Sequence, residues 1–196
     1  MEYPTARIAA VQQRLSAALN DIRSNTAYSD KGRKAEMARA TLAARQEAAR
    51  LKDGFIADRN ARREALERRL FGIIGSASAT ETLSMRDART RAKGITNSED
   101  AQAELRLANQ AGDTFLARAI TQVAFNKGWR DVVDTFAATA PPGAATALEE
   151  LNNIPSGPRT NTADELTFRI QAPTELLGVN DSTLELIARS DQAGAI

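Results

Sequence analysis

Apolar residues in the first part of the chain recur every three or four positions, the spacing of one face of an α-helix. A first run opens near Thr5, just after Pro4, and carries a narrow apolar seam of Ile8, Val11, Leu15, Ala18 and Ile22. A second run steps in the same way through Met37, Thr41, Ala44, Ala48, Leu51 and Phe55, and resumes at Leu66, Leu70 and Ile73. A polar stretch at 24–28 separates the two runs. Residues 1–75 are therefore predicted to form an antiparallel helical hairpin with coiled-coil-like seams.

The second helix of this hairpin is predicted to be long. Ser29 or Asp30 can cap its first turn, because either side chain accepts a hydrogen bond from the unpaired amides there. The helix is expected to run to about Ile74, with Gly54 as a place where it could kink or end. Its far half finds no partner in a hairpin with the short first helix. That half must meet the rest of the chain or another copy.

Small residues at 72–79 mark the predicted boundary with a second part, over 76–153. Helices are expected there over 80–93, 96–111, 113–126, 128–138 and 144–151, with Gly94 ending the first and a Thr96–Glu99 capping box opening the second. Residues 154–196 are predicted to form a linker and a docking tail, with an extended piece at 166–170 and a last helix at 182–189. The fold class is all-α: a hairpin with one long helix, a small helical bundle and a partly extended tail.

Composition excludes most familiar active sites. The chain has neither histidine nor cysteine, which removes imidazole bases, thiolate nucleophiles and the usual zinc ligands. No phosphate-cradling glycine loop is present. The acidic pairs Asp131–Asp134 and Glu149–Glu150 lack a third ligand and are read as surface acids. We expect no enzymatic activity, no catalytic residues, no metal and no cofactor.

Charge is sorted along the chain. Residues 1–95 carry a net +8, residues 96–196 a net −7, and the whole chain +1. Such asymmetry favours an anionic partner for the first half or head-to-tail contact between copies.

Arginines cluster on the second half of the long helix. Arg59, Arg62, Arg63 and Arg69 share a broad face and could contact phosphates of nucleic acid without regard to base sequence. The competing interpretation is a solvated face, balanced by neighbouring Asp58, Glu64 and Glu67. No aromatic residues interleave with these arginines, which disfavours stacking on single strands. Trp129, among Phe125, Val132 and Val133, is read as part of a core and not as a binding anchor.

Two segments carry a resemblance to a known group. Residues 28–33, Tyr-Ser-Asp-Lys-Gly-Arg, lead into an Ala/Arg-rich helix, and residues 115–119, Phe-Leu-Ala-Arg-Ala, precede Gly-Trp-Arg-Asp-Val-Val at 128–133. Together they resemble small helical virion and head-assembly proteins of tailed bacteriophages that infect actinobacteria. The resemblance implies a scaffold-like, minor virion or head–tail role and brings no catalytic or ligand residues.

The resulting hypothesis is a non-enzymatic phage structural or assembly protein that self-associates and docks on other virion proteins. Its interaction positions are expected among apolar residues of the two seams: Ile8, Leu15, Leu66, Leu70 and Ile73. The alternative is a nucleic-acid-binding accessory protein that uses the arginine face. We expect neither a secretion signal nor a membrane span, and a location in the cytoplasm of the infected host cell, in the virion or in both.

Overall fold

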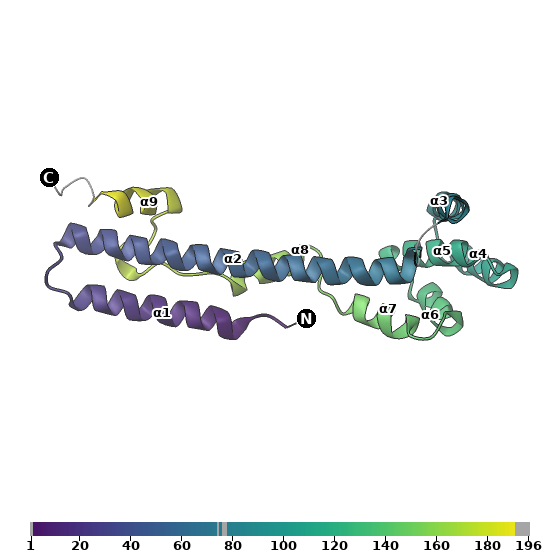
Figure 1. Cartoon of the computed structure of the whole chain (residues 1–196), viewed down its shortest axis with the longest axis horizontal. Helices are drawn as coiled ribbons and strands as arrows, with labels where there is room; N and C mark the ends of the chain where they lie inside the picture. The colour runs from purple at the N-terminus through teal and green to yellow at the C-terminus, as the bar shows by residue number, and fades with distance from the viewer. Residues whose placement is uncertain (1, 74, 76–77, 191–196) are drawn as a thin grey trace. The chain divides into compact units, whose positions relative to one another are not determined.

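The computed structural model describes residues 2–73, 75 and 78–190, and this part is all-α and without strands (Figure 1). The α-helices are α1 (Thr5–Ser24), α2 (Asp30–Phe71), α3 (Ala79–Lys93), α4 (Ser98–Ala111), α5 (Thr114–Lys127), α6 (Arg130–Thr139), α7 (Ala144–Asn152), α8 (Pro158–Thr167) and α9 (Asp181–Arg189), with a 3₁₀ turn η1 (Thr174–Leu176). The predicted all-α class is confirmed. The long second helix is also present, and Ser29 caps it by accepting a hydrogen bond from the Gly32 amide at 3.0 Å.

The chain forms two compact units, which divide it differently from the predicted segments. The first unit is Met1–Arg59 with Ser156–Ile196, and the second is Asn60–Pro155. Helix α2 contributes to both. The predicted boundary near residue 75 differs because the last turns of α2 pack with the helices that follow them. Residues 74, 76 and 77 of that predicted boundary lie outside the described residues.

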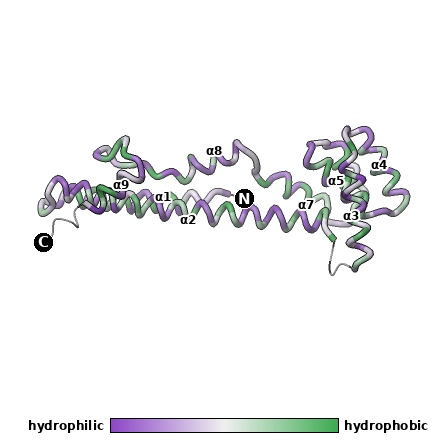
Figure 2. The backbone as a smooth tube through the Cα atoms, turned by 90° about the horizontal axis from the view of Figure 1, so that it is seen from above, coloured by the Kyte–Doolittle hydropathy of each residue, from purple (hydrophilic) through white to green (hydrophobic). Residues whose placement is uncertain are grey.

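In the first unit, α1 lies antiparallel to α2 (Figures 1 and 2). The apolar seams of the two helices are buried in one core. The buried residues contributed by the two helices are Ile8, Val11, Leu15, Leu19, Met37, Ala38, Ala44 and Ala48. Thr41 is also buried, and its hydroxyl donates to the Met37 carbonyl at 2.8 Å. Alanine at three of the α2 positions lets the two backbones approach closely.

The tail, defined here as residues 156–190, completes this core. Phe168, Ile170, Leu176 and Leu184 are buried in the same cluster as the hairpin seam. The predicted extended piece at 166–170 is wrong in its first part, because α8 runs to Thr167 and only 168–173 lack regular structure. The tail is therefore packed on its own hairpin, where the sequence predicted an arm for docking elsewhere.

The second unit is a helical bundle around α5. Helix α5 packs on α3, α4 and α6, while α6 also packs on α4 and α7. Leu66, Leu70 and Phe71 at the end of α2 belong to its core, together with Leu105 and Ile120. The far half of α2 thus finds its partner within the same chain. Trp129 is half-buried against this core, as predicted.

One predicted helix start in the second unit is wrong, because no capping box forms at Thr96–Glu99. The capping box lies at Ser78–Glu81, where each residue's side chain bonds the other's backbone amide. Helix α4 is capped by Asn97 and not by Thr96. Gly94 follows the last residue of α3, as predicted, and has a φ of −72°. Within the described residues, no helix has the length and apolarity needed to cross a membrane.

The tail's part in the first core can be measured by a matched pair of leucines in α9. Leu184 is fully buried, whereas Leu186 is 67% exposed. Leu184→Ala should lower the free energy of unfolding by about 2–5 kcal/mol, because it leaves a cavity. Leu186→Ala should change it by less than about 0.5 kcal/mol. Urea denaturation followed by circular dichroism measures both, and equal effects would contradict the packing of α9 described here.

Candidate functional site

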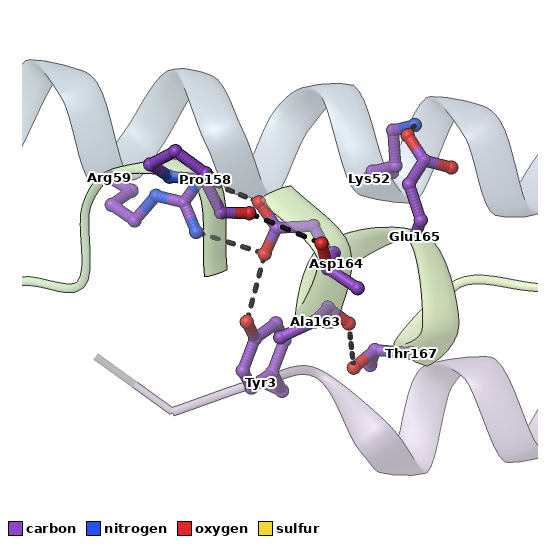
Figure 3. Close-up of polar contacts among 9 residues, drawn as sticks. Tyr3, Lys52, Arg59, Pro158, Ala163, Asp164, Glu165 and Thr167 are labelled. Atoms are coloured by element: carbon purple, nitrogen blue, oxygen red, sulfur yellow. Dashed lines mark hydrogen bonds and ion pairs between the residues drawn. The ribbon is translucent and has the colours of Figure 1, made fainter. Parts of the chain in front are cut away.

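Three distant segments of the first unit meet at the carboxylate of Asp164 (Figure 3). Arg59 of α2 donates two hydrogen bonds to it, from Nη1 to Oδ1 at 3.0 Å and from Nη2 to Oδ2 at 2.7 Å. The Tyr3 hydroxyl, just before α1, donates a third to Oδ1 at 2.9 Å. The side chains of Arg59 and Asp164 are only 7% and 2% exposed. We call Tyr3, Arg59 and Asp164 the clamp, because together they join the N-terminus, α2 and the tail.

Aromatic rings pack beside the clamp. The Tyr3 ring stacks on Phe55 with centroids 5.0 Å apart, and Phe168 of the tail lies 5.9 Å from Phe55. The guanidinium carbon of Arg59 is 5.6 Å from the centre of the Phe55 ring, a cation–π distance. In these surroundings the ion pair is screened little by solvent, so its geometry must be satisfied closely.

The clamp changes the pKa of each of its groups. The hydrogen bonds from Arg59 lower the pKa of Asp164 against the opposing effect of burial. Burial, and then the hydrogen bond to Asp164, raise the pKa of Tyr3. The hydrogen bonds to Asp164 raise the pKa of Arg59. All three shifts favour one charge state: an ionised carboxylate, a protonated guanidinium and a neutral phenol.

Further ion pairs fasten the acidic tail to the basic hairpin. Beside the clamp, Lys52 pairs with Glu165 at 2.6 Å (Figure 3). The Arg23 side chain at the end of α1 pairs with Glu175 through two hydrogen bonds of 2.8 and 3.0 Å. The remaining contacts are Arg45 with Asp181, and the Arg39 guanidinium donating to the Ala188 carbonyl. Much of the charge asymmetry read from the sequence is thus neutralised inside one chain.

The positions predicted for self-association lie mostly in the two cores. Ile8 and Leu15 are buried in the first unit, and Leu66 and Leu70 in the second. Ile73 follows the end of α2 and is half-buried. A side chain already buried by its own chain has almost no surface left for a second copy. The first four are therefore corrected from interaction residues to core residues.

The predicted arginine face is largely engaged. Arg59 is buried in the clamp and cannot reach a phosphate. Arg62 pairs with Glu150 at 2.6 Å, and Arg63 with Glu67 at 2.9 Å along the same helix. Arg69 is exposed, and no ion pair to it is found among the described residues. The structure thus does not bring the four arginines together as one free basic surface.

Sequence reasoning missed the exposed leucines, which among the described residues are Leu83 and Leu107 in the second unit and three in the tail. Leu166, Leu177 and Leu186 are 65–67% exposed. We call these three residues the outward leucines. Leu166 also lines two grooves that flank the tail, one of about 620 Å³ against α1 and one of about 510 Å³ against α2. The α9 sequence held a signal, since Leu184, Ile187 and Ala188 step by three and four, whereas Leu186 does not.

Metal binding finds no support in the described part of the chain, where no group of three or more acidic side chains gathers as ligands would. Asp131 and Asp134 lie exposed on α6, and Glu150 is used by Arg62.

The energetic weight of the clamp is testable through two neighbouring carboxylates of α8. Asp164→Asn should lower the free energy of unfolding by about 3–5 kcal/mol, because it leaves the Arg59 charge buried without its partner. Glu165→Gln removes a pair whose carboxylate is 71% exposed and should cost less than about 1 kcal/mol. Urea denaturation at pH 7 compares the two variants. Equal losses of unfolding free energy in the two variants would show that the buried pair is no stronger than the exposed one.

Acid should weaken the attachment of the tail. Hydrogen bonds from Arg23 lower the pKa of Glu175 from 4.5 to about 2. Because the folded-state pKa is the lower one, the stabilisation is complete above about pH 4.5 and is lost as the pH falls toward 2. Glu175→Gln should therefore have a lower urea midpoint than wild type at pH 7, with the two midpoints converging by pH 2. A difference that is constant over this range would contradict the assignment.

Comparison with known proteins adds no relative. The chain matches no protein-family model, no curated protein and no solved structure.

Proposed function

We propose that this protein is a non-enzymatic structural or assembly component of a tailed bacteriophage, which docks on other virion proteins through the outer side of its tail. The phage assignment comes from the resemblance of residues 28–33, 115–119 and 128–133 to small helical virion proteins. The proposal that the tail is the docking surface rests on the exposure of the outward leucines.

The outward leucines support docking because the tail divides its apolar residues between two sides. Leu176 and Leu184 are buried in the first core, while their neighbours Leu177 and Leu186 are about two-thirds exposed. Leu166 is exposed and lines two grooves, and a protein partner that covers such a surface gains hydrophobic energy. The clamp and the ion pairs hold this surface in place before any partner arrives, which reduces the entropy lost on binding.

This mechanism replaces self-association through the helical seams, since those seams are closed within one chain. The purified protein alone should accordingly remain a monomer in light scattering at micromolar concentration, and gain mass only with a virion partner. A concentration-dependent oligomer would favour self-association by a surface other than the buried seams.

Sedimentation tests both the association of the protein with phage particles and the docking surface on its tail. A tagged chain expressed during phage production should appear in density-gradient fractions that contain particles or their precursors. The double variant Leu166→Glu/Leu177→Glu should appear there at least about tenfold less, because two charges would have to be buried at the docked surface.

The matched control is Leu107→Glu, which changes a leucine of the second unit that is 56% exposed. It should sediment like wild type, and circular dichroism should show both variants folded. Absence of the wild-type chain from particles and precursors alike would overturn the phage role. Equal loss in the control would overturn the assignment of the surface to the tail.

A further inference from the structure

Two arginines of the second unit line one small pocket. Arg69 comes from the last turn of α2, and Arg118 comes from the middle of α5. The pocket has a volume of about 110 Å³. Its other lining residues are apolar: Leu70, Phe136, Pro141, Pro142 and Ala144.

The Arg118 guanidinium is held by a hydrogen bond to the backbone, and the Arg69 guanidinium lies close to a glycine. Arg118 donates from Nη1 to the Gly72 carbonyl at 2.9 Å, just after the end of α2. Nη2 of Arg69 lies only 2.8 Å from where a Cβ would stand on Gly143. The φ of +86° at residue 143 favours glycine, and the missing side chain there leaves space for the Arg69 guanidinium. The local backbone thus leaves room for a guanidinium at the pocket.

The pocket has positive charge without a protein counterion. Among the described residues, Arg59, Arg62, Arg63 and Arg68 of α2 each have a carboxylate within ion-pair distance, and Arg69 has none. No such pair to Arg118 is found in that part of the chain either, and no acidic residue lines the pocket. An anion held in this pocket would therefore face two guanidinium groups and no competing carboxylate.

We propose that this pocket binds a phosphoryl group. Two guanidinium forks match the oxygens and the double negative charge of phosphate, whereas a carboxylate would neutralise only one of them. The volume suits a group of this size, since a water molecule takes about 30 Å³ in the liquid. Free phosphate and the phosphates of nucleic acid share this chemistry, and the experiment separates the two sources.

Isothermal titration of the full chain with inorganic phosphate, at an ionic strength held constant with sodium chloride, tests the site. Wild type should bind one phosphate per chain with a saturable curve. Arg69→Gln and Arg118→Gln should each weaken binding by about 10- to 100-fold, the loss of a charge-assisted pair. Arg68→Gln is the matched control, because it changes the adjacent arginine, which pairs with Glu64 at 3.7 Å. The control should bind as wild type does.

Arg118→Gln could lose stability, because it removes the hydrogen bond to Gly72. Arg69→Gln is free of this problem, since the Arg69 side chain holds no hydrogen bond in the described part of the fold.

A second titration uses a short DNA duplex. Phosphate binding without DNA binding identifies a free phosphoryl ligand, and binding of both that falls in both variants identifies nucleic acid; either supports the pocket. No binding to either ligand, or binding that Arg69→Gln leaves unchanged, overturns it.

Discussion

The first unit depends on one buried ion pair. Arg59 and Asp164 are 105 positions apart, yet the guanidinium and the carboxylate form two hydrogen bonds away from solvent. Removing both charges from water is unfavourable, so the pair is tolerated only because its geometry is good and Tyr3 supplies a further donor. The contact fixes where the tail returns to α2. The burial of Phe168, Ile170, Leu176 and Leu184 on the hairpin follows from that position.

The opposite charges of the two halves of the chain are used within this fold to hold the tail on the hairpin. The basic hairpin and the acidic tail attract each other, and Arg23, Arg45, Lys52 and Arg59 each pair with a tail carboxylate. Opposite potentials would also steer two separate molecules together, which is why the sequence favoured an external partner. The exposed pairs are individually weak, but with the clamp they give the tail a unique register.

The surfaces that remain after this internal pairing are the ones with a functional interpretation. The tail turns Leu166, Leu177 and Leu186 outward and has a groove on either side of Leu166. In the second unit, Arg69 and Arg118 line a pocket whose other residues are apolar. The two features lie in different units and bear on different ligands, a protein surface and a phosphoryl group. Each can therefore fail without the other.

Local sequence determined most of the helices, because apolar spacing, capping residues and turn formers act over a few positions. The seam of Ile8, Val11 and Leu15, the cap at Ser29 and the turns at Gly112 and Gly128 are examples. Helix α8 is the exception, since the sequence predicted a linker and an extended piece there. What covers each seam was decided by the tertiary structure. Leu66 and Leu70 carry the same signal whether they are buried in the core of the second unit or against another copy, and Arg59 looks like its neighbours until Asp164 is brought to it. Periodicity reports that a face is apolar or charged but holds no record of its partner, since that choice depends on contacts between residues about a hundred positions apart.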